Sequence, residues 1–194
     1  MDKESLRREF LSQRRALSSK EVTQRSSRVL DQLLRASFWK KGLKVGLYYP
    51  FQGEVDVKPL LSISQIEPYL PRSREDIFEY CPWHTHDEDD ETLVPGSWNE
   101  DILEPSEHAK AVALDFLDVI VVPGIVFDHR GHRLGFGQGW YDRILKNFDG
   151  VAVGLAYDFQ VIEKLPDQPH DQACDWIVSE SALFKGTSRR SRRL

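Results

Sequence analysis

The stretch VVPGIVFDHRGHRLGFGQGWYDRIL, residues 121–145, constrains the fold and the function of this chain more than any other segment. The apolar run at 119–122 is typical of a buried strand, which Pro123 and Gly124 end. Beyond the loop, three residues at helical spacing can share one face of a helix: Tyr141, Ile144 and Leu145. The sequence therefore predicts a strand, a long loop and a helix in that order.

The loop carries glycine at every second position, at Gly135, Gly137 and Gly139. Glycine allows positive φ, so backbone N–H groups can turn toward an anion, and the start of the next helix adds unpaired donors. Arg130 and Arg133 can neutralise phosphate oxygens, and Asp142, in the first helical turn, can hold a divalent cation. These features predict a nucleotide site. The pattern is neither a P-loop nor a G-x-G-x-x-G fingerprint, so a tight loop with surface arginines stays open.

Composition sets the class of protein. A chain of 194 residues with 40% apolar and 29% charged residues suits one soluble α/β domain. The formal charge of −5 gives no reason to expect a nucleic-acid partner, and no apolar run is long enough to span a membrane. Cys81 and Cys174 lie in unrelated contexts, which favours reduced thiols and a cytoplasmic location. We expect a monomer.

Domain 1–184 is expected to end where a basic tail begins. The tail, 185–194, holds five basic residues and no acidic residue, and we expect it to be disordered and solvated. The most polar stretch, 84–91, contains His84 and His86 among carboxylates. A solvated hairpin tip is the better interpretation of it than a metal site, because no apolar scaffold stands nearby.

Two helices are predicted at the N-terminus. The first carries Leu6 and Phe10 at helical spacing, and Ser18 with Glu21 forms a capping-box pattern for a second helix over 19–36. That second helix should bury five apolar residues: Val22, Val29, Leu30, Leu33 and Leu34. Further along, strands are expected at 44–49, 77–83, 114–122, 151–156 and 175–178, and another strand is expected to end at 72. A short helix is expected at 58–64.

The string VVPG-I-V-FD-x-x-G-x-RLG-x-G-x-G-x-YD resembles the signature of the 5-formyltetrahydrofolate cyclo-ligase family. Lys3-x-x-Leu6-Arg7, followed by Arg14-Arg15-x-Leu17-Ser18, is similar to the family's opening motif. The segment around Glu54, after the first predicted strand, and Leu103-Glu104-Pro105 also fit the family's pattern. The resemblance covers the chain from Lys3 to about Val178.

The resemblance implies an α/β fold: a single-domain three-layer sandwich, with a mostly parallel sheet and helices on both faces. Such a fold is Rossmann-like and related to the sugar-phosphate isomerase and CoA-transferase folds. It also implies a reaction in which ATP drives the cyclisation of 5-formyltetrahydrofolate to 5,10-methenyltetrahydrofolate, with release of ADP and phosphate. The intermediate would be a phosphorylated formyl group, an iminium phosphate.

Roles for individual residues follow from the same resemblance. The residues implied in catalysis are Lys3, Arg133 and Tyr141. Those implied in ATP binding are Lys3, Arg7, Arg133, Leu134, Gly135, Phe136, Gly137, Gln138, Gly139, Trp140 and Tyr141. Those implied in folate binding are Tyr49, Glu54, Trp98, Phe136, Gly137, Gln138, Gly139 and Trp140. Asp142 and Asp171 would hold Mg²⁺, which prefers a few hard oxygen ligands from protein.

The loop departs from the family's usual residues at three positions. Trp140 keeps an aromatic face where the family has tyrosine or phenylalanine, whereas Gln138 and Phe136 replace residues that are cationic in some members. Two other classes of function stay open: a non-catalytic binder of nucleotide or folate, and an enzyme resembling sugar-phosphate isomerases or acyl-CoA transferases. The isomerase and the transferase would need no ATP.

Overall fold

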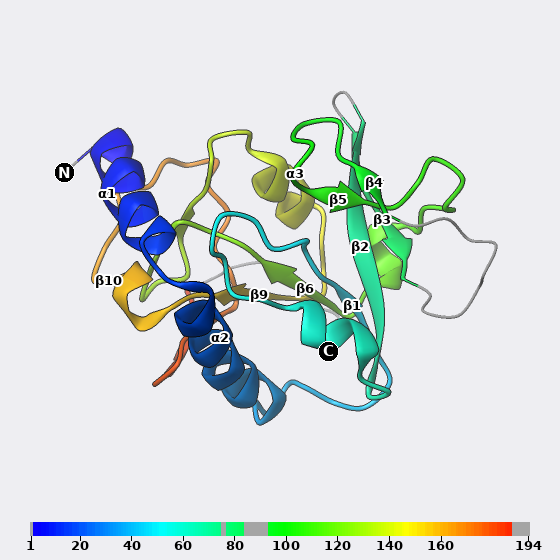
Figure 1. The fold of residues 1–194 in the computed structure, drawn as a ribbon, viewed down its shortest axis with the longest axis horizontal. Coiled ribbons are helices and arrows are strands. Elements are labelled where there is room, and N and C mark those ends of the chain that lie inside the picture. The colour runs from blue at the N-terminus through cyan, green and yellow to red at the C-terminus, as the bar shows by residue number, and fades with distance from the viewer. Residues whose placement is uncertain (1, 75–76, 84–92, 188–194) are drawn as a thin grey trace.

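Seven strands form the central sheet of the computed structural model, which describes residues 2–74, 77–83 and 93–187 (Figure 1). They are β1 (Leu43–Gly46), β2 (Ile66–Arg74), β3 (Ile77–Pro82), β6 (Val119–Val122), β9 (Val151–Leu155), β11 (Trp176–Val178) and β12 (Leu183–Lys185). Their order across the sheet is β12-β11-β9-β6-β1-β2-β3. The fold is therefore mixed α/β with a large central sheet.

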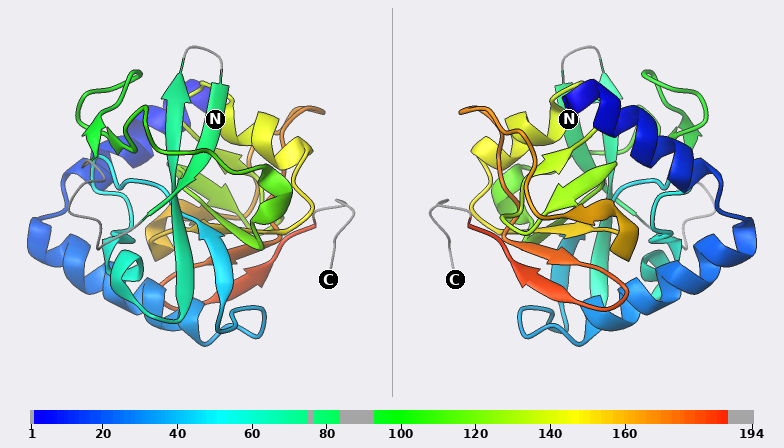
Figure 2. Two further views of the ribbon diagram at one scale, coloured as in Figure 1. Left: turned by 90° about the vertical axis from the view of Figure 1, so that its right-hand side faces the viewer. Right: turned by 90° about the vertical axis from the view of Figure 1, so that its left-hand side faces the viewer.

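The inner strands of this sheet are parallel. β11, β9, β6, β1 and β2 pair in parallel, while β3 and β12 join the two edges in the antiparallel sense. Figure 2 shows the long β2–β3 hairpin in one view and the C-terminal strands in the other. Because carboxyl ends of parallel strands meet at one edge, the segments that follow β1 and β6 reach the same region of the molecule.

Three helices are described: α1 (Lys3–Arg15), α2 (Ser19–Leu34) and α3 (Trp140–Lys146). The predicted capping box at the start of α2 is present, with the Ser18 hydroxyl accepting from the Glu21 backbone and the Glu21 carboxylate accepting from Ser18. Asp2 caps α1 through a 2.8 Å bond from the Ser5 backbone.

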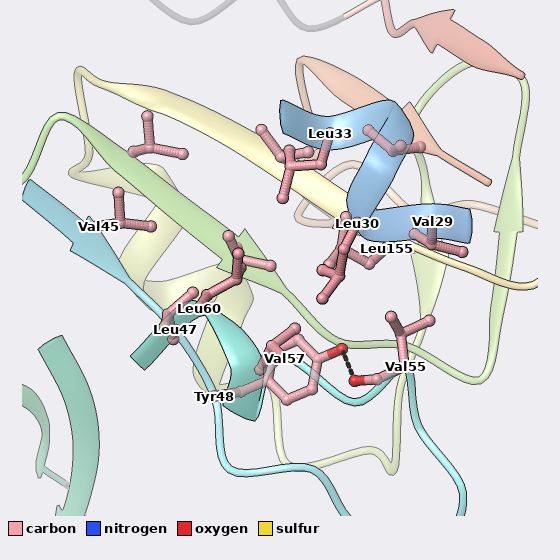
Figure 3. Close-up of a cluster of buried hydrophobic side chains, with 14 of the residues drawn as sticks. Val29, Leu30, Leu33, Val45, Leu47, Tyr48, Val55, Val57, Leu60 and Leu155 are labelled. Carbon is pink, nitrogen blue, oxygen red and sulfur yellow. Dashed lines mark hydrogen bonds between the residues drawn. The ribbon is translucent and has the colours of Figure 1, made fainter. Parts of the chain in front are cut away.

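Helices α2 and α3 cover opposite faces of the sheet. Val119 and Val121 of β6 lie in one apolar cluster with the buried side of α2, whereas Ile120 and Val122 lie in a second cluster with α3. Figure 3 shows the first cluster, which contains buried residues of α2, Val45 of β1 and side chains from the segment that follows β1. Successive side chains of β6 thus anchor both helices.

Helix α1 packs on a smaller sheet instead. That sheet has the order β10-β7-β8 and consists of β7 (Val126–Asp128), β8 (Arg133–Leu134) and β10 (Val161–Ile162). Leu6 and Phe10 of α1 form a third apolar cluster with Val126 and Leu134 of this sheet. A third sheet pairs β4 (Val94–Pro95) with β5 (Leu103–Glu104).

Several predicted elements differ from the structure at their ends. The segment 58–64 forms a 3₁₀ turn, η1 (Lys58–Ser62), and the strand expected at 114–122 starts with another, η2 (Leu114–Phe116). Local bonds such as that from the Leu117 N–H to the Leu114 carbonyl hold η2, so the chain enters the sheet only at Val119. A further 3₁₀ turn, η3 (Asp158–Gln160), follows β9.

Two expectations about burial and the tail are wrong. Leu34 is 37% exposed, although Leu33 in the same turn is fully buried, because Leu34 lies at the edge of the helix face that packs on the sheet. Lys185, expected as the first tail residue, is the last residue of β12 and pairs with Trp176. The ordered chain therefore continues past residue 184. The predicted hairpin tip at 84–91 and residues 188–194 lie outside the described residues.

Candidate active site

A cavity of about 580 Å³ lies beyond the carboxyl ends of β1 and β6. Parts of the chain that are distant in sequence line it: the first turns of α1, the segment after β1, strand β2, the glycine loop, α3 and the loop at 168–171. The lining includes Lys3, Arg7, Tyr49, Glu54, Ser73, Phe78, Trp98, Glu104, Arg133, Leu134, Gly135, Phe136, Gly137, Gln138, Gly139, Trp140, Tyr141, Asp142 and Asp171.

The glycine loop takes the conformation that its glycines allow. Gly137 and Gly139 have φ values of 100° and 67°, which other L-residues rarely adopt, and Gly139 is the N-cap of α3. The carbonyl of Gly135 accepts a 2.8 Å hydrogen bond from Arg7 Nε. The loop is therefore tied to α1 and lies open to the cavity on its other side.

Two ion pairs line one end of the cavity. Lys3 Nζ lies 2.7 Å from Asp171 Oδ2, and Arg133 Nη2 lies 3.1 Å from Asp142 Oδ1. Burial disfavours the charge on Asp171, yet hydrogen bonds from Lys3 and from the Gln168 backbone outweigh it and lower the pKa of this carboxyl below its ordinary value. The ionised form of Asp171 is therefore stabilised, and a cation faces each of the two carboxylates.

A backbone hydrogen bond places the segment that carries Asp171 beside Asp142. The Gln172 backbone N–H, next in sequence to Asp171, donates a 3.0 Å bond to Asp142 Oδ1. No cluster of three or more His, Cys, Asp or Glu side chains occurs among the described residues. Two carboxylates fit Mg²⁺ nevertheless, since this ion keeps several waters and takes the rest of its oxygens from substrate phosphates.

A buried carboxylate marks the other end of the cavity. Glu54 is 7% exposed, its Oε2 accepts a 3.1 Å bond from the Phe51 backbone, and its Oε1 lies 3.7 Å from Arg14 Nη1. Burial raises the pKa of Glu54 to about 7, against the opposing charge of Arg14. A second buried carboxylate, Glu104, is already committed to the backbone and hydroxyl of Ser73.

Aromatic side chains form the walls between the two ends. Phe136 lies 5.9 Å from the ring of Phe51 and 5.9 Å from that of Trp98. Across the cavity lining, Phe78 contacts Trp140 at 5.5 Å and Tyr141 at 5.4 Å. Flat, apolar walls of this kind suit a planar ligand with ring faces.

Comparison with known proteins agrees with this architecture. Residues 1–180 match the 5-formyltetrahydrofolate cyclo-ligase family. The chain belongs to this family. The 5-formyltetrahydrofolate cyclo-ligase of Escherichia coli K12 is 33% identical over 73% of this chain and 80% of its own length. That of Mycoplasma pneumoniae is 30% identical over 93% of this chain and 99% of its own.

Solved structures extend the likeness to the fold. The 5,10-methenyltetrahydrofolate synthetase of Aquifex aeolicus, an NMR structure, is 37% identical and covers 100% of this chain with a TM-score of 0.81; 96% of that chain is covered. The synthetase of Mycoplasma pneumoniae is 26% identical with a TM-score of 0.70, over 93% of this chain and 99% of that one. The cyclo-ligase fold therefore extends over nearly the whole chain.

All sixteen residues to which the family resemblance gave a role in catalysis or binding line this cavity. Arg130 does not: it binds Asp128 and Asp167, at 2.7 and 2.9 Å, away from the cavity lining. Phe78, in β3, has no signal in the sequence that predicts a place in the cavity lining. Arg14 belongs to the opening motif, but a basic residue next to Arg15 in a helix gives no sign of burial.

A membrane span requires a helix of a certain length and hydropathy. None of the helices in the described residues is both long enough and apolar enough to span a bilayer.

Proposed function

We propose that this protein catalyses the ATP-dependent cyclisation of 5-formyltetrahydrofolate to 5,10-methenyltetrahydrofolate, with release of ADP and phosphate. One observation carries the proposal: a single cavity holds a cationic, glycine-lined end suited to phosphates and, at its other end, a buried carboxylate between aromatic walls. Membership of the cyclo-ligase family, and relatives whose names state the cyclo-ligase or synthetase activity, support the same substrates.

The chemistry accounts for a site with two ends. An amide oxygen is a poor leaving group, so the formyl oxygen attacks the γ-phosphorus of ATP and ADP leaves. The resulting iminium phosphate carries an electrophilic carbon, which the neighbouring folate nitrogen attacks to close the ring. That nitrogen loses its proton, and phosphate departs with the former formyl oxygen. The enzyme must therefore hold both substrates in line and neutralise the transferring group.

The phosphate end is assigned to α1 and the glycine loop. Lys3 and Arg133 would contact the transferring phosphoryl group and stabilise its charge, and Arg7 holds the loop through the Gly135 carbonyl. The loop from 134 to 140 offers backbone N–H groups to the other phosphate oxygens. Tyr141 would complete the wall beside the reacting groups.

Asp142 and Asp171 would hold the magnesium ion of the nucleotide. The ion, when bound, neutralises charge on the phosphate oxygens. The proposal is supported by the two carboxylates lying beside Lys3 and Arg133 in one cavity.

The folate end is assigned to the segment after β1 and to the aromatic walls. Glu54, as a carboxylate, would accept two hydrogen bonds side by side, one on each oxygen, from the amide and amino donors of the pterin edge. Tyr49, Trp98, Phe136 and Trp140 would contact the rings of the substrate. Gly137, Gln138 and Gly139 would lie between the two substrates.

An absorbance assay tests the function directly. Purified protein is mixed with 5-formyltetrahydrofolate, with and without ATP and magnesium, and the formation of methenyltetrahydrofolate is followed. Product that forms only when ATP is present supports the proposal. Binding of both ligands without product would indicate a non-catalytic binder, and turnover of a sugar phosphate without ATP would indicate an isomerase-like enzyme.

The wider expectations belong to the same proposal. We infer one domain over the described residues with the three-layer, Rossmann-like arrangement, supported by helices α2 and α3 on opposite faces of the sheet. We also infer a cytoplasmic monomer with small-molecule substrates and no nucleic-acid partner. Light scattering after size exclusion tests the monomer.

A further inference from the structure

The side chain of Arg14 lies fully inside the protein, beneath the folate end of the cavity. Its exposed fraction is 0%, although it belongs to the last turn of α1. Its Nε donates to the Gln52 carbonyl and its Nη1 to the Gly124 carbonyl, both at 2.9 Å. Arg14 therefore joins α1 to the turn after β1 and to the end of β6.

Arg14 also fixes the turn that carries Glu54. Gln52, with a φ of 48°, is the one non-glycine residue with a positive φ among those the structure describes. Gly53 follows at a φ of 72°, and a Cβ there would lie 3.0 Å from the Arg14 carbonyl oxygen. Such a backbone persists only where its surroundings hold it, and Arg14 contacts it from two sides.

Stability alone is a poor explanation for this arginine. One terminal nitrogen, Nη2, is buried without a hydrogen-bond partner among the described residues. A buried donor without a partner destabilises the fold, and buried ion pairs are often replaced by apolar residues without loss of stability. The buried positive charge of Arg14 therefore calls for an explanation other than the stability of the fold.

That explanation is the charge on Glu54. Burial raises the pKa of this carboxyl to about 7, and the Arg14 guanidinium is the main influence that opposes the rise. Three tyrosines also lie near Glu54, and Asp56 follows it by two residues. Tyr157 Oη donates to the Glu54 carbonyl at 3.2 Å, Tyr48 Oη donates to the Val55 carbonyl at 2.7 Å (Figure 3), and Tyr141 belongs to α3. Burial raises the pKa of each tyrosine, so they stay neutral near pH 7.

We propose that Arg14 is a positioning residue for folate recognition: its positive charge faces the Glu54 carboxylate, and its hydrogen bonds hold the 51–54 turn in the shape that presents this carboxylate to the pterin. The inference rests on the proposed function and deepens it. Helix α1 then serves both substrates, since Lys3 and Arg7 lie at the phosphate end and Arg14 lies beneath the folate end.

The test compares three variants. Arg14→Met removes the charge, Arg14→Lys keeps it, and Arg8→Met removes an exposed charge from the same helix as a control. For each we would measure the KM for 5-formyltetrahydrofolate, the dissociation constant for ATP and the pH dependence of kcat/KM for the folate. Circular dichroism and the melting temperature report whether the fold survives.

Arg14→Met is expected to raise the KM for folate about tenfold or more and to change ATP binding less than about threefold. Ionised Glu54 can accept from two pterin donors, whereas the protonated carboxyl places its own O–H against one of them, so kcat/KM should fall as pH drops through its pKa. Loss of Arg14 raises that pKa and should move the acid limb of the profile up by about one pH unit or more. Arg14→Lys should restore the position of the limb, and Arg8→Met should behave as wild type.

An unchanged acid limb and folate KM in folded Arg14→Met would overturn the inference, as would equal losses of folate and ATP binding. If Arg14→Met does not fold, Arg14→Lys decides: the lysine cannot make both carbonyl bonds, so a wild-type acid limb with a raised folate KM supports the inference, and a wild-type KM overturns it. If the wild-type protein makes no methenyltetrahydrofolate, the proposed function itself is wrong. That result is distinct from an active wild type in which Arg14 has no effect on folate binding.

Discussion

Lys3 Nζ lies 2.7 Å from Asp171 Oδ2, although the two residues are 168 positions apart in the chain. Arg133 and Asp142 form a second such pair in the same cavity, at 3.1 Å. Each cation assigned to phosphate is thus matched with a carboxylate assigned to magnesium.

Lys3→Met is expected to raise the KM for ATP by about tenfold to a hundredfold, because a charged hydrogen bond to a phosphate is lost. The KM for the folate should change little. Lys20→Met, at an exposed position of α2, is the matched control. Steady-state kinetics with each substrate varied in turn measure both constants, and equal effects of the two variants on ATP use would contradict the assignment of Lys3.

Arg133→Ala and Arg130→Ala separate a catalytic arginine from a structural one in the same loop. Arg133 lines the cavity, so its loss should lower kcat/KM for ATP by about 10²- to 10³-fold. Arg130 instead neutralises Asp128, which is fully buried, so its loss should cost about 1–3 kcal/mol of unfolding free energy. Kinetics and urea unfolding of both variants give the comparison.

The result that would remove Arg133 from the site is wild-type ATP kinetics in Arg133→Ala with an intact fold. If Arg130→Ala lowers ATP use at unchanged stability, the phosphate clamp includes Arg130 and the side chain moves on binding.

Asp142→Asn is expected to abolish most turnover, and raised magnesium should restore part of it. Asp171→Asn should have a smaller effect, because water can replace one ligand of an octahedral ion. The measurement is the rate as a function of magnesium concentration for wild type and both variants. One magnesium dependence common to all three proteins would mean that the carboxylates are structural and that Asp142 only complements the start of α3.

Glu54→Gln is expected to weaken folate binding by about 2–4 kcal/mol, because an amide N–H would then face a pterin donor in a buried site. The size of the side chain is kept and the charge is removed. The KM for 5-formyltetrahydrofolate at saturating ATP reports the loss. No change in that constant, or an equal loss of ATP affinity, would move Glu54 out of the folate end.

Glu54 should also make stability depend on pH. Burial raises its pKa from 4.5 to about 7, so between these values the folded state binds a proton that the unfolded state has released. The free energy of unfolding contributed by this group therefore falls as pH rises from about 4.5 to 7. Wild type should lose roughly 2–3 kcal/mol relative to Glu54→Gln between pH 5 and pH 8. Parallel urea-unfolding curves for the two proteins across this range would refute the shift.

Local signals in the sequence predicted the elements that depend on local chemistry. The capping box at Ser18 predicted the start of α2, and the apolar run at 119–122 coincides with β6, although the strand was expected to begin earlier, at 114. The glycine spacing predicted a loop with positive φ, which Gly137 and Gly139 have. The sixteen residues to which the resemblance gave a role come from several motifs along the chain, and the cavity brings them together from distant segments.

Features that depend on distant contacts were not predictable. Strand β12 exists because Leu183–Lys185 pairs with β11, and a run of three residues does not by itself indicate an edge strand. The burial of Arg14 depends on carbonyls 38 and 110 positions away. Phe78 lines the cavity because β3, paired with β2, brings its ring against Trp140 of α3.

Helix α1 begins at Lys3, and Asp2 already serves as its cap. An affinity tag fused ahead of this point would start within a few residues of a side chain that lines the cavity. Extra residues there can displace the Asp2 cap and compete for Asp171 with charges of their own. Kinetic constants for this protein should therefore be measured after the tag has been cleaved, or on a protein purified without one.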